Sequence, residues 1–146
     1  MDKARNFRNY KVWQDAVEYS TKIYQQTDKM PWFEKKGLCD QLQRAVVSIS
    51  SNIAEGSAKP SNADFARFLD TALGSAYEVE TQLLIANKIG YIKNQNENDN
   101  QNENQNDNQN NNQNENGFSF EELLVGIQEI EKQLAGLIRT LRREQK

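Results

Sequence analysis

The chain has 146 residues with a formal net charge of −3, and it contains no His and one Cys. The missing His removes the commonest acid–base group and metal ligand, and a single Cys excludes an internal disulfide and every multi-cysteine zinc site. Its length predicts one domain over residues 1–146, and no apolar run is long enough to span a membrane. The polar, charged start has no signal-peptide pattern, so we expect a cytoplasmic protein.

The first predicted helix covers residues 9–28. Apolar and small side chains recur three and four positions apart from Trp13 to Tyr24, which predicts one buried face of an amphipathic helix. Pro31 ends this segment, because proline biases the residue before it away from helical geometry. The second predicted helix covers residues 33–55 with an apolar stripe from Leu38 to Ile53, and Gly56 is its expected stop signal.

The third predicted helix runs to Ile89. It begins at Ser61, and the acidic Asp64 three residues later makes a variant of the capping box. Apolar residues at helical spacing then continue from Phe65 along one face of the helix. Gly90 follows directly and is the expected C-cap, because glycine readily adopts the left-handed conformation that ends many helices.

A low-complexity tract separates the third helix from the fourth. From Asn94 to Asn116 the chain uses only Asn, Gln, Asp and Glu, with Asn at every even-numbered position. Without apolar side chains it cannot bury enough surface to offset the entropy of ordering it, so we predict a disordered loop insert over residues 94–117. Five of the 21 acidic residues lie in this tract, which leaves the rest of the chain with 18 basic and 16 acidic residues.

The fourth predicted helix opens with a full capping box from Ser119 to Glu122, and Phe118 can pack onto Leu123 as a hydrophobic staple. Basic residues in its last turns complement the helix dipole. Its apolar residues alternate four and three apart, which is the pattern of a heptad seam. The seam consists of Leu123, Ile127, Ile130, Leu134, Leu137 and Leu141.

Together these segments predict an all-α, antiparallel up-down-up-down four-helix bundle, with the insert between helices three and four. Small residues inside the last two helices permit close backbone approach, either within the bundle or between subunits, and the sequence leaves both possibilities open. These small residues are Ala72, Gly74, Ser75, Ala76, Gly126 and Gly136.

Polar residues three or four positions apart share a second face of helix two, and similar residues occur on helix three. The two sets fit three interpretations: a ligand or RNA site, a hydrogen-bonded network at a subunit seam, or a solvated face. The residues are Gln41, Arg44, Ser48, Asn52 and Glu55 on helix two, and Ser75, Glu78 and Gln82 on helix three.

None of these sets combines an acid, a base and a nucleophile. Di-metal carboxylate bundles need Glu-x-x-His motifs, which a chain without His lacks, and no Gly-rich phosphate-binding loop occurs. Without a His to activate it, Cys39 is expected to be a small buried thiol rather than a nucleophile. We therefore expect no enzyme activity, no catalytic residue, no cofactor and no metal.

Several blocks of sequence together resemble a known family. The blocks are Phe7 with Tyr10-Lys11-Val12-Trp13-Gln14, Gly37-Leu38, Gln41-Leu42, Arg44-Ala45-Val46-Val47-Ser48-Ile49, Asn52-Ile53-Ala54-Glu55-Gly56, Phe65, Phe68-Leu69, Ala72-Leu73-Gly74-Ser75, Glu78 and Glu80-Thr81-Gln82-Leu83-Leu84. They resemble the small four-helix bundle proteins encoded within intervening sequences of bacterial 23S ribosomal RNA genes. The resemblance covers about residues 5–93, and the Asn/Gln tract departs from it where members have a short loop.

This resemblance implies a cytoplasmic bundle assembled as a homopentameric ring. It also implies distant kinship to the accessory proteins of diversity-generating retroelements, which bind nucleic acid and a reverse transcriptase. No catalytic residue comes with the resemblance. Its signature positions, expected at the subunit seam or on the inner wall of the ring, are Arg44, Ser48, Asn52, Glu55 and Glu78.

In an up-down-up-down bundle, both chain ends and the turn between helices two and three share one pole. Ten basic residues against four acidic ones give this pole a net charge of about +6. The ten are Lys3, Arg5, Arg8, Lys11, Lys59, Arg67, Arg139, Arg142, Arg143 and Lys146. They are a candidate footprint for the phosphates of RNA or DNA, unless they only solvate the ends and complement helix dipoles.

The leading expectation is therefore a non-enzymatic homo-oligomer that associates weakly, and without sequence preference, with nucleic acid. The alternative is a protein-interaction scaffold that docks a partner such as a polymerase or reverse transcriptase. Trp32 and Phe33 are candidate exposed anchors for such a partner, although we expect them to pack as loop residues onto the core.

Overall fold

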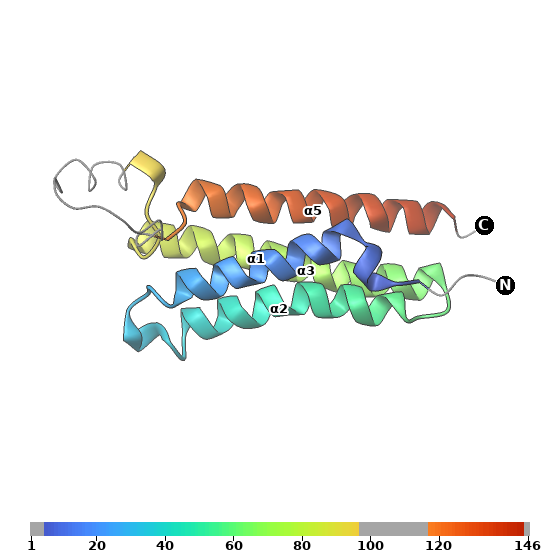
Figure 1. Ribbon diagram of the computed structural model, residues 1–146, viewed down its shortest axis with the longest axis horizontal. Coiled ribbons are helices and arrows are strands. Elements are labelled where there is room, and N and C mark those ends of the chain that lie inside the picture. Colours follow the sequence, from blue (N-terminus) through green and yellow to red (C-terminus); the bar gives the residue numbers. More distant parts are fainter. Residues whose placement is uncertain (1–4, 97–116, 145–146) are drawn as a thin grey trace, which may run out of the picture.

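The computed structural model describes residues 5–96 and 117–144. Its elements are η1 (Phe7–Asn9), α1 (Lys11–Thr27), η2 (Trp32–Glu34), α2 (Leu38–Ser57), α3 (Asn62–Ile89) and α5 (Phe120–Arg143). Figure 1 shows the four long helices side by side in alternating directions, and no strand occurs in the part of the chain described. The predicted all-α antiparallel bundle is confirmed.

The tract predicted as a disordered insert begins after α3 and ends before α5, as expected. Its residues 97–116 lie outside the described ranges.

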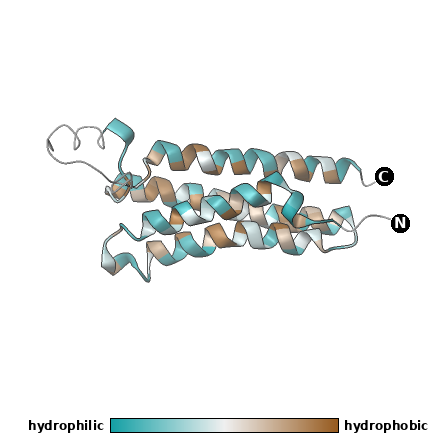
Figure 2. Ribbon diagram, viewed as in Figure 1, coloured by the Kyte–Doolittle hydropathy of each residue, from teal (hydrophilic) through white to brown (hydrophobic). Residues whose placement is uncertain are grey.

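Each helix turns an apolar face toward a shared core. In Figure 2 the brown residues alternate with teal ones along every helix, as expected when one face is buried and the other solvated. Ile23, Leu42, Leu69, Leu83 and Ile127 are among the fully buried side chains. Burying one such side chain contributes about 1.5–3 kcal/mol, so helix packing is the main source of stability.

The predicted helix caps are confirmed. Ser61 Oγ accepts a hydrogen bond from the Asp64 N–H at 3.1 Å, and Ser119 Oγ accepts one from the Glu122 N–H at 3.2 Å. Gly90 ends α3 with φ of 99°, in the left-handed region where a residue with a side chain is strained. These three positions could be predicted from residue type, because each cap satisfies backbone groups that a helix end leaves unpaired.

The predicted start of helix two at residue 33 is wrong. Trp32–Glu34 form the separate 3-10 turn η2 after Pro31, and α2 begins at Leu38. The Glu34 carboxylate accepts a hydrogen bond from the Leu38 N–H at 3.1 Å, so this side chain caps α2 from outside the helix. A carboxylate four positions upstream is not part of the usual cap pattern, which explains the five-residue error.

The glycines of α3 and α5 differ in what surrounds them. A Cβ added at Gly126 would lie 2.7 Å from the Tyr19 ring, so this glycine allows α1 and α5 to pack closely within the bundle. A Cβ at Gly74 would meet nothing within 4 Å, and one at Gly136 would meet only the Arg139 side chain at 4.0 Å. Of these three glycines, Gly126 is therefore the one that packing inside the described chain requires.

Candidate nucleic-acid interface

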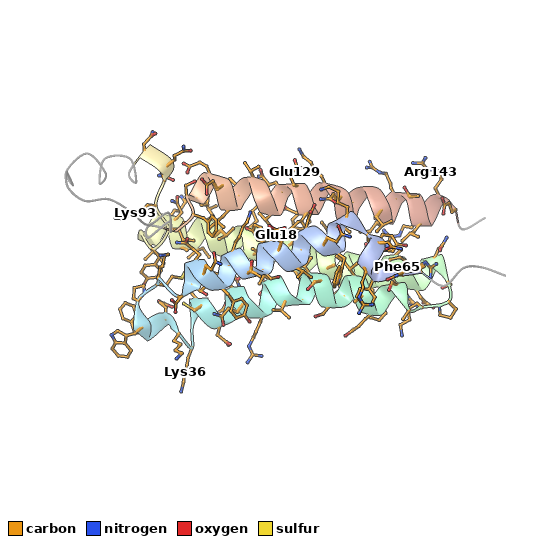
Figure 3. All side chains as sticks on the ribbon, viewed as in Figure 1. Glu18, Lys36, Phe65, Lys93, Glu129 and Arg143 are labelled. Atoms are coloured by element: carbon orange, nitrogen blue, oxygen red, sulfur yellow. The ribbon has the colours of Figure 1, made fainter. Side chains whose placement is uncertain are left out.

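The first described residues, the end of α5 and the α2–α3 turn lie at one end of the bundle, as Figure 1 shows. Arg143 lies at this end of α5 in Figure 3, at the opposite end of the molecule from Lys36. The fold thus brings together cations from remote parts of the sequence. We call this end the basic tip and define it by Arg5, Lys59, Arg67, Arg139, Arg142 and Arg143.

Arg5 fastens the N-terminal segment to the start of α3. Its guanidinium donates to the Lys59 carbonyl at 2.6 Å and to Asn62 Oδ1, and it lies 5.0 Å from the centre of the Phe65 ring. All of these partners are neutral, so the hydrogen bonds fix the position of Arg5 without cancelling its charge.

Two other arginines of the basic tip are paired with carboxylates. Arg67 donates to Asp64 one turn away on α3, and Arg142 of α5 donates to Asp70 of α3. Hydrogen bonds from Arg67 and Ser61 lower the pKa of Asp64, so this carboxylate stays ionised at neutral pH. Both pairs lie on the exposed surface, where solvent screens them, so a phosphate oxygen can take the place of the carboxylate.

Lys59, Arg139 and Arg143 are exposed and make no ion pair with any described residue. The Lys59 ammonium lies 5.1 Å from the centre of the Phe68 ring, a contact that leaves its charge uncancelled. Together with Arg5, these residues make the tip positively charged despite the acidic total charge of the chain.

Of the remaining predicted cations, Lys11 is paired with a carboxylate, whereas Arg8 is exposed and makes no ion pair with a described residue. The Lys11 ammonium is 2.6 Å from the Asp15 carboxylate, which also accepts from Gln133 at 2.8 Å. Gln133 precedes the last residue of α5 by ten positions, so Lys11 is about 15 Å back from the tip. The Arg8 guanidinium lies over the Phe7 ring in η1, 4.7 Å from the ring centre. Lys3 and Lys146 lie outside the described residues.

Among the polar residues predicted to share a face of helices two and three, several form a hydrogen-bonded network at the contact between α2 and α3. Ser75 Oγ donates to Ser48 Oγ at 2.9 Å, and the Asn52 amide donates to Ser48 Oγ at 2.9 Å and to the Ser48 carbonyl at 2.8 Å. All three side chains are half-buried. The structure therefore places a network at this position, although part of each side chain still faces outward.

The network is incomplete at Gln82. Its amide donates over long distances, 3.4 Å to Gln41 Oε1 and 3.3 Å to Glu78 Oε1. Its own Oε1 is buried and accepts no hydrogen bond from the described part of the chain. An acceptor left unpaired in this way costs about 1–3 kcal/mol, so a donor from outside the chain would be favoured here.

Arg44 and Glu55 do not join the network, although their spacing suggested it. Arg44 Nε pairs with the Asp40 carboxylate at 2.9 Å on the exposed surface of α2. Glu55 is also exposed, in the last turns of that helix. Both side chains are accessible to another molecule.

A buried carboxyl group in α5 was not predicted. Glu131 is 8% exposed, and it hydrogen-bonds to the half-buried Glu80 of α3, which also accepts from Gln128 at 2.9 Å. Burial, together with Glu80, raises the pKa of Glu131 to about 7. The sequence did carry a signal, because Glu131 stands four residues after Ile127 and three before Leu134, on the buried face.

Tyr19 of α1 faces the same carboxyl pair. Its hydroxyl donates to the Leu123 carbonyl at 2.7 Å, and burial, with the two nearby carboxyl groups, raises its pKa. The hydroxyl is therefore protonated at all ordinary pH values and acts as a structural donor rather than a base.

Trp32 and Phe33 are 86% and 61% exposed, so the expectation that they pack onto the core is wrong. Cys39, by contrast, is 5% exposed, as predicted. Burial raises the pKa of its thiol, which disfavours the reactive thiolate.

Within the described ranges, no group of three or more His, Cys, Asp or Glu side chains could hold a metal ion. None of the helices there is long and apolar enough to cross a lipid bilayer.

Comparison with known proteins agrees with the resemblance read from the sequence. A search of curated proteins found none that matches this chain. The solved structure of a protein of unknown function from the S23 ribosomal protein family of Bacteroides thetaiotaomicron VPI-5482 is 25% identical, with a TM-score of 0.65 over 88% of this chain and 98% of that one. Residues 8–111 match the profile of the 23S rRNA-intervening sequence proteins, and the chain therefore belongs to that family.

Proposed function

We propose that this protein is a non-enzymatic, ring-forming nucleic-acid-associating bundle of the cytoplasm, which contacts phosphates through the basic tip. The main support for this proposal is a set of positive charges at the tip that no carboxylate of the described residues neutralises. Arg139 and Arg143 have no carboxylate partner among the described residues, and Arg5 is held only by neutral groups.

The contacts of the tip favour nonspecific phosphate binding rather than base readout. The cations come from separate segments of the chain at one end of the bundle, an arrangement that suits contacts along a phosphate backbone. The paired Arg67 and Arg142 can exchange their exposed carboxylates for phosphate oxygens. The description of the solved relative as a member of a ribosomal protein family fits association with RNA.

Assembly into a ring would repeat the tip along one rim. The proposed seam is the α2–α3 face, where Gln82 Oε1 lacks a donor and Arg44, Glu55 and Glu78 stay exposed. Ile85 and Ile89 of α3 are 45% and 56% exposed, which adds apolar surface to this face. We propose a homopentamer on the family resemblance, since contacts within one chain do not fix the number of subunits.

Salt-dependent binding tests the tip. A filter-binding titration of single-stranded RNA should give log K falling with log salt by about 0.7 per neutralised phosphate. Arg139→Gln with Arg143→Gln should weaken binding and reduce this slope by about 1 or more. The matched control, Lys22→Gln with Lys132→Gln, removes the same charge away from the tip and should leave the slope unchanged. If log K does not change with salt, or if its slope is the same in both double variants, the basic tip is not the phosphate-binding site.

A pair of glycine variants tests the seam. Gly74 and Gly136 both have room for a side chain within the chain, so replacing either with Gln should not disturb the bundle. Gly74 lies beside Ser75 of the network, whereas Gly136 is on α5. Light scattering should give an oligomer for the native chain and for Gly136→Gln, but a smaller particle for Gly74→Gln. If Gly74→Gln has the same oligomer mass as the native chain, the α2–α3 face is not the contact between subunits.

The second candidate is a protein-interaction scaffold. The exposed Tyr77, Leu84 and Ile85 of α3, at 52%, 46% and 45%, favour it, because this strip could dock a protein such as a polymerase instead of a neighbouring subunit. A monomeric mass, with partners retained in pull-downs after nuclease treatment, would support the scaffold over the ring.

A further inference from the structure

The α1–α2 connection presents two aromatic rings to water. Trp32 and Phe33 stand next to each other in η2, with ring centres 6.1 Å apart and ring planes at 78°. Exposed at 86% and 61%, they forgo most of the hydrophobic gain that burial of such rings would give. Neither ring is needed to complete the core.

The segment that carries these rings is fixed by hydrogen bonds. The Glu34 N–H donates to the Pro31 carbonyl at 2.9 Å, and the Gly37 N–H donates to the Glu34 carbonyl at 2.9 Å. The Glu34 carboxylate accepts from the Leu38 N–H at 3.1 Å and from the Tyr91 hydroxyl at 3.2 Å. The rings are therefore held on a braced turn, which lowers the entropy lost when a ligand binds.

A hollow of about 570 Å³ opens beside Trp32, within the size range of small-molecule sites. We call it the Trp32 hollow. The buried sulfur atoms of Met30 and Cys39, 3.7 Å apart, lie at its base. Trp32 and the half-exposed Tyr24 are its aromatic lining, and its polar lining includes Gln25, Thr27, Asp28, Lys35 and Gln43.

Two exposed lysines lie at the hollow, together with nearby carboxylates. Lys35 lines it and Lys36 follows in sequence; both are exposed and neither pairs with a described carboxylate. Figure 3 shows Lys36 directed away from the bundle. Glu34 accepts its two hydrogen bonds from neutral donors and keeps its charge, whereas Asp40 is paired with Arg44 at 2.9 Å. Asp28 is the acidic group that lines the hollow.

We propose that the Trp32 hollow is a base-stacking site for single-stranded nucleic acid. A nucleobase stacks on the Trp32 indole, with Tyr24 nearby, and the adjoining phosphates contact Lys35 and Lys36. The amide groups of Gln25 and Gln43 and the Asp28 carboxylate can bond to the edge of the base. An aromatic platform flanked by lysines fits a base and its phosphate better than a protein surface, which would need a wider apolar area around the two rings.

This site is independent of the basic tip. The 28 residues of α3 span about 42 Å between the two ends of the bundle, so a tetranucleotide bound at one end cannot reach the other. Loss of nucleic-acid binding at the basic tip and loss of base stacking at the Trp32 hollow can therefore be observed independently of each other.

Fluorescence of the full chain tests the proposal. In a Trp13→Phe background Trp32 is the only Trp, and oligo-uridine tetranucleotide should quench its emission at low salt. The matched probe is an abasic tetranucleotide with the same phosphates, which should not quench. Equal effects of the two probes, or no effect of either, would overturn the proposal.

Binding of the same tetranucleotide by variants, measured calorimetrically, sharpens the test. Trp32→Ala should weaken it about 5- to 100-fold, Trp32→Phe less, and Val125→Ala, which removes another exposed apolar side chain, not at all. Circular dichroism checks the fold of each. Unchanged affinity in Trp32→Ala would contradict a stacking site. A variant that changes only the oligomer mass would also contradict it, because the hollow would then be a contact between copies of the chain.

Discussion

The two ends of the bundle differ in the kind of group they expose. The basic tip presents arginines from both chain ends, several without a carboxylate partner in the described part of the chain. The opposite end presents Trp32 and Phe33, braced by Glu34. Phosphates suit the first surface and bases the second. Net charge, which is −3 for the chain, therefore says little about either end.

The largest predicted effect concerns the close packing of α2 against α3 at the tip. A Cβ at Gly56 in the last turn of α2 would lie 2.5 Å from Phe68 Cβ and 3.3 Å from the Phe65 carbonyl oxygen. Gly56→Leu should therefore destabilise the protein by about 1–3 kcal/mol or more in urea unfolding. Gly136→Ala, whose Cβ would meet only the Arg139 side chain at 4.0 Å, should stabilise it by about 1 kcal/mol. Equal effects would mean that the tip is not tightly packed.

Between pH 5 and 8, the stability of the protein should respond to the buried carboxyl group in the middle of the bundle. Since the pKa of Glu131 rises from 4.5 to about 7 on folding, the folded chain holds a proton that the unfolded chain releases between these pH values. Stability should therefore fall as pH rises from 5 to 8, by about 2–3 kcal/mol. Glu131→Gln mimics the protonated form and should remove this loss. A pH-independent native protein would contradict the buried pair with Glu80.

The N-caps allow a matched comparison of the two ends. Ser61 caps α3 at the tip and is exposed, whereas Ser119 caps α5 at the other end and is 4% exposed. Replacing either with Ala should cost about 1 kcal/mol, and Ser119→Ala should cost more because water cannot replace a buried acceptor. Thermal unfolding of both variants measures the difference, and the reverse order would show that the α5 start is solvated.

The smallest effect is expected at the aromatic end. Trp32→Ala should change the free energy of unfolding by no more than about 0.5 kcal/mol, because the side chain is 86% exposed. A loss above 2 kcal/mol in urea unfolding would mean that the indole supports the fold rather than a ligand.

The fold was predictable because its signals are local. Capping at Ser61 and Ser119 and the apolar spacing of each helix depend on residues one or two turns apart. The start of α2 was mispredicted because Glu34 caps it from a separate turn. The exposure of Trp32 depends on where η2 stands relative to the bundle, which no local pattern encodes.

The candidate site was predictable only in outline. Alternating helix directions were enough to bring the chain ends together at one pole. Which cations stay available depends on tertiary partners: Arg5 is fastened to Lys59 and Asn62, and Lys11 is drawn back by Asp15. The partners of Arg5 are 54 and 57 positions away, so spacing cannot reveal them, whereas Lys11 and Asp15 are an i,i+4 pair that spacing could have revealed.

Photo-crosslinking of the full-length protein to a single-stranded RNA containing 4-thiouridine, followed by mass spectrometry of the peptides, tests the central claim most directly. The account predicts crosslinks to peptides containing Lys59, Arg139 and Arg143, lost as salt increases. Crosslinks confined to the sides of the bundle, around Lys22 and Lys132, would contradict it.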